Sequence, residues 1–215
     1  MKVGLFGGTF NPIHLAHLRA AEEVREALCL DSVIFVPAKT PPHKVPDTVS
    51  DAKRRLGLVR AAIADNPRFE VSEIELRREG PSYSVDTLRA ILGGNLAPAR
   101  LWFIVGADAF VEMDTWKSAR EIFSLTDIAV MGRPPWNACP PPPPAFAGDF
   151  EPLPTGYRHL SGREIRFIPV TPLDISSTLI RQALAEGRSV RYLVPEGVRA
   201  LIEGRQGSGT GEDNG

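Results

Sequence analysis

Apolar residues near the start of the chain change from a short continuous run to a helical repeat. Residues 3–6 form a run that is typical of a buried strand. Between positions 18 and 28, apolar residues recur every three or four positions with charged residues between them, which predicts an amphipathic helix on one face of a sheet. Residues 32–36 are β-branched and aromatic, as in a second strand. This opening therefore predicts a strand–helix–strand unit with a right-handed crossover.

The same two periodicities continue along the chain to residue 203. Further strands are predicted at residues 69–76, 101–105, 127–131 and 164–170, and helices after Ser50, after either Ser82 or Ser84, and at residues 195–203. The run LWFIV at 101–105 is the most hydrophobic and is expected to be a central parallel strand. The pattern predicts a single Rossmann-like α/β domain over residues 1–203, with a doubly wound and mainly parallel sheet.

Prolines interrupt this pattern between positions 134 and 154, where nine of the twenty prolines lie. Residues 140–144 are all proline, and neither a core helix nor a central strand can pass through such a run. We predict an exposed, partly polyproline II excursion over residues 134–160 that acts as a linker, with a ligand for an SH3-type or WW-type domain as the alternative. The tail at 204–215 has no apolar residue and is predicted to be disordered.

Composition narrows the class of protein. The chain has 215 residues, 43% of them apolar, which suffices for one sizeable core. A net charge of −1 gives no general attraction to nucleic acid or to an anionic membrane, and no apolar run approaches the roughly 18 residues of a membrane span. Only Cys29 and Cys139 are present, and the first strand begins without a signal peptide. We expect a cytoplasmic protein that binds small molecules, of unknown oligomeric state.

The segment GGTFNPIHLAH joins the first strand to the first helix. Gly7 and Gly8 lack a Cβ atom, so we expect a sharp turn there that lets a ligand approach the backbone amides of Thr9 and Phe10. The helix that follows would direct the positive end of its dipole at the same place. Both features favour a bound phosphate.

His14 and His17 lie three residues apart, so we expect both imidazoles on one face of the first helical turn. Two imidazoles beside a helix N-terminus can donate hydrogen bonds to a phosphoryl group while its charge shifts during a reaction. A zinc site is the alternative, but no third Cys, His or carboxylate lies at ligand spacing nearby. The pair therefore favours phosphoryl chemistry.

GGTFNPIHLAH resembles the GGxFxPxHxGH signature of the nucleotidylyltransferase superfamily. Its residues are most similar to those of bacterial nicotinate-nucleotide adenylyltransferases. Ala16 stands where the family has glycine, and a helical backbone accommodates this small change. The resemblance implies adenylyl transfer from ATP to nicotinate mononucleotide, with Mg²⁺ held by the substrate phosphates. His17, assisted by His14, would then donate to the α-phosphoryl oxygens, and residues 7–10 would bind ATP.

The segment ISSTLIR at residues 175–181 begins another predicted helix. Hydroxyls at its start with an arginine one turn in predict a second anion site, and a capped helix with an exposed arginine is the alternative. The segment matches the family's ISSTxIR motif, which implies that it binds the ATP triphosphate, that the backbone near Ile175 faces adenine, and that Arg181 neutralises the departing pyrophosphate. The residues so implied are Ile175, Ser176, Ser177, Thr178 and Arg181.

Two further segments resemble the family's mononucleotide site. GPSYSVDTL is similar to GxSYTxDTL, whose main-chain amides receive the pyridine carboxylate, and this implies Tyr83 and Ser84 as contacts, although Tyr83 could instead pack in the core. Trp116, expected in a loop before a short helix, is either a core anchor or, as in the family, a platform for the nicotinate ring. Lys117 follows it where the family often has an aromatic residue or histidine, which leaves the second wall of the ring pocket open.

The remaining candidates follow predicted strands. Gly106 would let a purine approach the backbone, and Asp108 would accept from ribose hydroxyls or cap a helix; IVGAD resembles the family's IGAD. Arg133 would pair with a phosphate of the mononucleotide or lie on the surface. Lys44, in the proline-rich loop PAKTPPHK, would contact the β and γ phosphates, as the family implies, or be solvated.

Other functions stay open at this point. A related adenylyltransferase could take the amide mononucleotide, and sequence does not show the balance of donors around one carboxylate. The SYS segment and Trp116 argue against pantetheine phosphate or a CTP-dependent reaction. A non-catalytic nucleotide sensor would not need His14, His17 and Arg181. An oxidoreductase is disfavoured because GGTF lacks the GxGxxG spacing.

Overall fold

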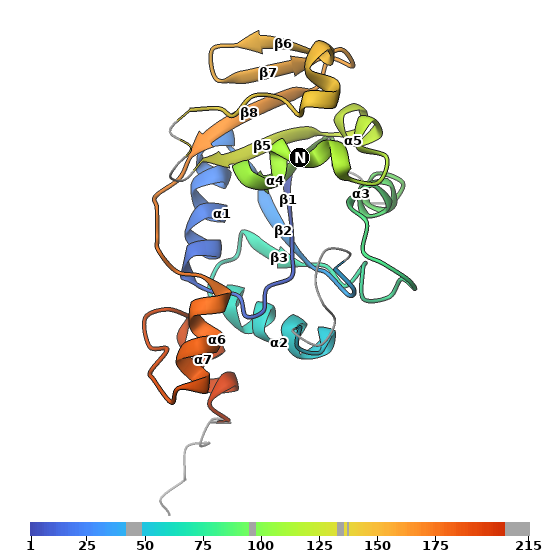
Figure 1. The fold of residues 1–215 in the computed structure, drawn as a ribbon. Coiled ribbons are helices and arrows are strands. Elements are labelled where there is room, and N and C mark those ends of the chain that lie inside the picture. Colours follow the sequence, from blue (N-terminus) through green and yellow to red (C-terminus); the bar gives the residue numbers. More distant parts are fainter. Residues whose placement is uncertain (42–48, 95–97, 133–135, 137, 205–215) are drawn as a thin grey trace, which may run out of the picture.

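A computed structural model describes residues 1–41, 49–94, 98–132, 136 and 138–204. The strands found there form one eight-stranded sheet in the order β3-β2-β1-β4-β5-β8-β7-β6 (Figure 1). The strands are β1 (Lys2–Gly8), β2 (Ser32–Pro37), β3 (Phe69–Val71), β4 (Arg100–Gly106), β5 (Asp127–Gly132), β6 (Phe150–Leu153), β7 (Gly156–His159) and β8 (Glu164–Pro169). Only the pairings that involve β6 and β7 are antiparallel. The predicted α/β fold, with a mainly parallel sheet and a central strand at residues 101–105, is confirmed.

Helices lie against both faces of the sheet and bury two apolar cores. The first core contains residues of α1 (Leu15–Leu28), α2 (Ala52–Ile63), α6 (Ser177–Ala185) and α7 (Glu196–Ile202). The second contains residues of α3 (Ser84–Leu92), α4 (Ala107–Val111) and α5 (Ala119–Leu125), together with the 3₁₀ helix η2 (Met113–Thr115). None of the helices in the described ranges has the length and apolar character that a membrane crossing needs. Both faces of the central strands are therefore covered by protein.

Strand β3 is shorter than the predicted run of residues 69–76. Its pairing with β2 covers Val33 to Phe35 only, and one more hydrogen bond joins the Ser72 amide to the Phe35 carbonyl. The chain then turns, and the Arg77 amide donates to the Glu73 carbonyl. The apolar residues of this segment therefore do not extend the strand, because the chain turns away before β2 ends at Pro37.

One helix start differs in detail from the prediction, and the structure decides between the two serines predicted for another. Asp51, and not Ser50, caps α2, because its carboxylate accepts from the amides of Lys53 and Arg54 at 2.9 and 3.1 Å. Of the two serines proposed for the start of α3, Ser84 is its first helical residue. The hydroxyl of Ser82 instead accepts from the amides of Lys39 and Thr40 beyond β2.

The proline-rich segment is more ordered than predicted. After the proline run, the 3₁₀ helix η3 (Pro144–Asp149) leads into the β6–β7 hairpin, which extends the sheet (Figure 1). The ring of Phe150 lies edge to face against Phe123 at 5.1 Å, so the hairpin is anchored on the second core. Pro152 is tolerated because β6 is the outermost strand, where a missing backbone donor interrupts no ladder.

Arg55 on α2 is almost fully buried, with 1% of its surface exposed. Its guanidinium donates to the carbonyls of Ser50 at 2.9 Å, Thr9 at 2.7 Å and Lys39 at 3.3 Å. Burial lowers the pKa of Arg55, because the charged form loses its hydration. One side chain thus ties the start of α2 to the segments that follow β1 and β2.

We expect Arg55→Met to destabilise the fold by about 3 kcal/mol, because three partly buried carbonyls lose a charged donor. Urea unfolding followed by circular dichroism measures the change. Arg54→Met removes the same charge from the exposed neighbouring position and should stay within about 0.5 kcal/mol of wild type. Equal stability of the two variants would contradict the structural role of Arg55.

Candidate active site

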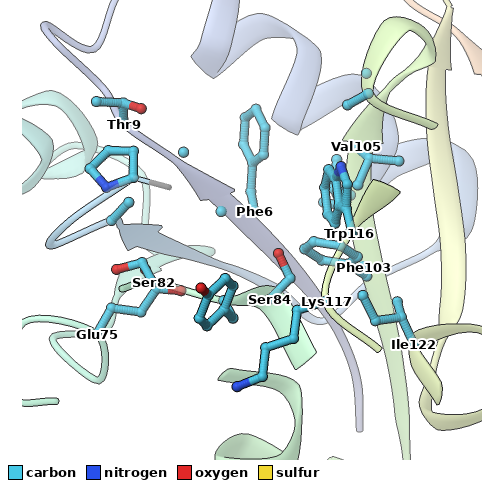
Figure 2. A pocket seen from close by; sticks show the side chains of 18 of the residues that line it. Phe6, Thr9, Glu75, Ser82, Ser84, Phe103, Val105, Trp116, Lys117 and Ile122 are labelled. Atoms are coloured by element: carbon cyan, nitrogen blue, oxygen red, sulfur yellow. The ribbon is translucent and has the colours of Figure 1, made fainter. Parts of the chain in front are cut away.

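A cavity of about 310 Å³ opens at the carboxyl ends of three neighbouring parallel strands (Figure 2). Residues 6–9, at and beyond the end of β1, and residues 103–106 of β4 line it, together with Ala38 after β2. Of the site residues expected from the sequence, those in the lining are Gly7, Gly8, Thr9, Tyr83, Ser84, Gly106 and Trp116. The sheet edge where α/β proteins bind ligands therefore carries a ready-formed cavity.

The sharp turn after β1 lies later than expected. Gly7 and Gly8 are the last two residues of the strand, whereas Phe10 has a φ of 47° and the Asn11–Pro12 peptide bond is cis. A Cβ atom on Gly8 would lie 2.8 Å from Cζ of Phe10. Glycine at position 8 thus makes room for the Phe10 ring, and the backbone reverses at residues 10–12.

Side chains from distant helices hold this turn. The Thr9 carbonyl accepts from Arg55. The carbonyl of Asn11 accepts from Nη1 of Arg181 at 2.8 Å, and that of Pro12 accepts from Oγ of Ser177 at 2.9 Å. The two motifs that the sequence singled out, 165 to 170 residues apart at these contacts, therefore touch directly.

His14 and His17 lie together at the start of α1, as predicted. His14 is the N-cap residue and His17 belongs to the first turn. Their rings stack with centroids 3.7 Å apart and an interplanar angle of 29°, and the His17 ring also meets Phe10 edge to face at 5.2 Å. His14 is buried, whereas His17 is partly exposed. The less buried ring is the one more accessible to a ligand.

A backbone hydrogen bond orients the His17 imidazole. Its Nδ1 accepts from the amide of His14 at 3.3 Å, as in a capping box. In the neutral ring, an accepting Nδ1 requires the proton on Nε2. We therefore assign Nε2–H of His17 as a hydrogen-bond donor at the N-terminal end of the helix.

The ISSTLIR segment forms the start of α6. Ser176 caps this helix by accepting from the Leu179 amide at 3.1 Å, and Oγ1 of Thr178 accepts from Nη2 of Arg181 at 3.2 Å. Ile175 packs against the first core. The capping alternative thus holds for Ser176, while binding of an anion by these residues stays a prediction.

The aromatic end of the cavity is built by Trp116 and its neighbours. Trp116 is partly buried on the second core, and its ring lies 6.2 Å from that of Phe103, so its roles as core anchor and as exposed platform are compatible. Tyr83 is the N-cap residue of α3, and the ammonium of Lys117 lies 4.5 Å from the centroid of its ring. Tyr83 and Lys117 thus line the cavity beside Trp116.

Gly106 ends β4 and is the N-cap residue of α4. A Cβ atom there would lie 2.4 Å from Oδ1 of Asp108, so any other residue would require that exposed carboxylate to move. Asp108 is exposed in the first turn of α4 and does not line the cavity. The capping alternative for Asp108 is therefore wrong, because the cap lies two residues earlier.

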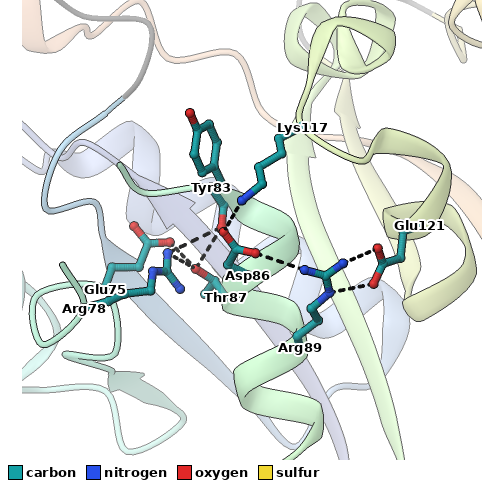
Figure 3. Close-up of polar contacts among 8 residues, drawn as sticks. All are labelled: Glu75, Arg78, Tyr83, Asp86, Thr87, Arg89, Lys117 and Glu121. Atoms are coloured by element: carbon teal, nitrogen blue, oxygen red, sulfur yellow. Dashed lines mark hydrogen bonds and ion pairs between the residues drawn. The ribbon is translucent and has the colours of Figure 1, made fainter. Parts of the chain in front are cut away.

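Sequence reasoning missed Glu75, which lies on the segment predicted as strand. Its side chain lines the cavity, is 7% exposed, and accepts from the hydroxyl of Thr87 at 2.6 Å (Figure 3). Arg78 donates to the same hydroxyl oxygen at 3.1 Å. Burial raises the pKa of Glu75, although hydrogen bonds from Thr87 and Ser82 and the charge of Arg78 oppose this. No local pattern marks a glutamate as buried.

Two predicted phosphate contacts, Lys44 and Arg133, lie outside the described residues. Within the described part of the chain, no group of three or more His, Cys, Asp and Glu side chains is arranged to hold a metal ion.

Comparisons with known proteins agree with this geometry. A family model described as cytidylyltransferase-like matches residues 5–183. The relative from Syntrophotalea carbinolica, named probable nicotinate-nucleotide adenylyltransferase, is 46% identical over 208 residues, which cover 94% of each chain. Relatives with the same name from Geobacter sulfurreducens and Exiguobacterium sibiricum are 44% and 43% identical over 94% of this chain and 95% and 96% of their own.

Solved structures share the fold at low sequence identity. Nicotinic acid mononucleotide adenylyltransferase of Plasmodium falciparum, complexed with NaAD, has a TM-score of 0.71 at 14% identity, over 94% of this chain and 95% of that chain. The same enzyme complexed with APC has a TM-score of 0.69 at 13% identity, over 94% of both chains. These likenesses support the arrangement of the elements.

The raised pKa of Glu75 gives a pH-dependent stability. The folded state holds the Glu75 proton more tightly than the unfolded state, so its contribution to the free energy of unfolding is complete below pH 4.5 and is lost as the pH rises through the folded pKa. We expect the stability of wild type relative to Glu75→Gln to fall over that window in urea titrations. Glu79→Gln, at an exposed position, is the control. A rise with pH in the stability of wild type relative to Glu75→Gln would contradict the assignment.

Proposed function

The chain belongs to the nicotinate-nucleotide adenylyltransferases within the cytidylyltransferase-like family, and we propose that it transfers the adenylyl group of ATP to nicotinate mononucleotide. The products are nicotinate adenine dinucleotide and pyrophosphate. The observation that carries the proposal is the stacked pair of His14 and His17 at the start of α1, just beyond the turn that Ser177 and Arg181 of α6 contact. A helix N-terminus with imidazole donors suits a reacting phosphoryl group.

We assign the mononucleotide ring to the aromatic end of the cavity. Trp116 would stack on the ring, and the backbone at Tyr83 and Ser84, where α3 begins, would receive its carboxylate. Arg133 is proposed to contact the mononucleotide. ATP would lie over Gly7, Gly8, Thr9 and Phe10, near Gly106 and Asp108. Its triphosphate would lie at Ser176, Ser177 and Thr178, and its adenine would face the backbone near Ile175.

In the proposed reaction, a phosphate oxygen of the mononucleotide attacks the α-phosphorus of ATP in line, and pyrophosphate leaves. Nε2–H of His17 donates to the α-phosphoryl oxygens, whose negative charge changes in the transition state, and His14 assists. Arg181 and Lys44 neutralise the leaving pyrophosphate. A guanidinium has five N–H donors, so Arg181 can bind phosphate oxygens while it holds the Asn11 carbonyl.

Magnesium is proposed to accompany the nucleotide. Mg²⁺ prefers oxygen ligands, whereas the described side chains around the two histidines supply imidazole, hydroxyl and guanidinium groups. These groups fit the phosphates, so the phosphates themselves would carry the cation. Bound there, Mg²⁺ would neutralise charge on the departing pyrophosphate. Since ATP is a substrate, we infer that the enzyme works in the cytoplasm.

The reaction is tested by pyrophosphate release with ATP and Mg²⁺ and either nicotinate mononucleotide or its amide. We expect faster release with the acid. His17→Ala should lower kcat by about 10²–10³-fold, because a donor to the transition state is lost, while ATP binding measured by calorimetry persists.

Arg19→Ala, which changes an exposed residue of the same helix, is the control and should keep its rate. Near-normal turnover of His17→Ala would contradict the proposed donation by His17 to the α-phosphoryl oxygens. Release with the amide alone would reassign the substrate.

A further inference from the structure

Lys117 holds a distinctive place in the cavity. Among the described residues that line it, Lys117 has the only cationic side chain and Glu75 the only carboxyl group (Figure 2). Lys117 directly follows Trp116, the expected platform for the ring. A positive charge therefore lies at the end of the cavity where a substituent of that ring would project.

The ammonium of Lys117 contacts two side chains. It donates to Oδ2 of Asp86 at 2.9 Å and lies over the ring of Tyr83 (Figure 3). This hydrogen bond is the main cause that lowers the pKa of Asp86, so the partner is a carboxylate. The Lys117 side chain is 46% exposed. An ion pair this exposed contributes little free energy, so Lys117 can exchange it for another anion.

Asp86 has a second cation that does not line the cavity. Nη1 of Arg89 lies 3.1 Å from Oδ1 of Asp86, and two hydrogen bonds from Arg89 to Glu121 fix that guanidinium between α3 and α5 (Figure 3). If Lys117 turns away, Asp86 thus keeps a charged partner. The arrangement lets one cation move without leaving a carboxylate unpaired.

The acid and amide mononucleotides differ by one negative charge on the ring substituent. A cation attracts the carboxylate and gains nothing comparable from the neutral amide, which is how a site separates ligands of nearly equal shape. The opposing carboxyl group of Glu75 has its pKa raised by burial, which reduces its repulsion of an anionic ligand. The cavity walls are mainly apolar, which strengthens any charge interaction inside it.

We propose that the ammonium of Lys117 turns from Asp86 to the ring carboxylate of the mononucleotide and thereby selects the acid over the amide. Lys117 is then a specificity-determining residue. The assignment rests on the proposed adenylyl transfer to nicotinate mononucleotide and adds a side-chain charge to the backbone contacts expected at Tyr83 and Ser84.

Lys117→Met tests the charge because methionine keeps a flexible stem of similar length. We expect kcat/KM for the acid to fall about 10- to 100-fold, chiefly through KM, and that for the amide to change less than about threefold. Lys117→Arg keeps the charge and should retain the preference for the acid. Arg120→Met removes a positive charge from an exposed residue of α5 that pairs with Asp149 outside the cavity, and it should leave both substrates unaffected.

Calorimetric binding of the two mononucleotides to the same variants separates this assignment from the reaction. Loss of acid binding in Lys117→Met, with amide binding unchanged, supports it even if no pyrophosphate is released. An equal loss for both ligands would show that Lys117 only supports the cavity wall and would overturn the proposal. An unchanged ratio of acid affinity to amide affinity in Lys117→Met would also overturn the proposal. Absence of pyrophosphate release by wild type with either ligand would reject the proposed reaction alone.

Discussion

The turn at residues 9–12 depends on side chains that come from two distant helices. Its carbonyls at Thr9, Asn11 and Pro12 lie beyond the strand, and they accept from Arg55, Arg181 and Ser177. Buried carbonyls without donors would each cost about 1–3 kcal/mol, so these contacts decide whether the turn keeps its shape. Because His14 follows the turn directly, the position of the histidine pair depends on them too.

The same contacts link the stability of the turn to the proposed binding of phosphate. Arg55 has a structural role, since its buried guanidinium serves only backbone carbonyls among the described residues. Arg181 combines two roles, because it holds the Asn11 carbonyl and is also proposed to bind phosphate. A ligand that uses its remaining donors would strengthen the contact between α6 and the turn. Binding of ATP would thus tighten the segment that precedes the histidines proposed to be catalytic.

Two acidic residues near the start of α3 have pKa values that are shifted in opposite directions. Burial raises the pKa of Glu75, whereas the hydrogen bond from Lys117 lowers the pKa of Asp86. Glu75 faces the cavity, whereas Asp86 pairs with Lys117 and Arg89 outside it. Among the described residues that line the cavity, Lys117 supplies the cationic side chain.

The sequence by itself determined the α/β fold, the parallel strands, most helices and the two motifs, because hydrophobic periodicity and short-range spacing encode them locally. It also predicted that His14 and His17 lie together, and the structure brings them together as the N-cap and N3 residues of α1. Tertiary structure decided the position of the turn at residues 10–12 and the burial of Glu75 and Arg55. Arg55 reads as part of a solvated basic run, KRR, and its partner Thr9 is 46 residues away. Hydrogen bonds over such separations leave no periodic signal, so only the folded chain shows which polar residues are buried.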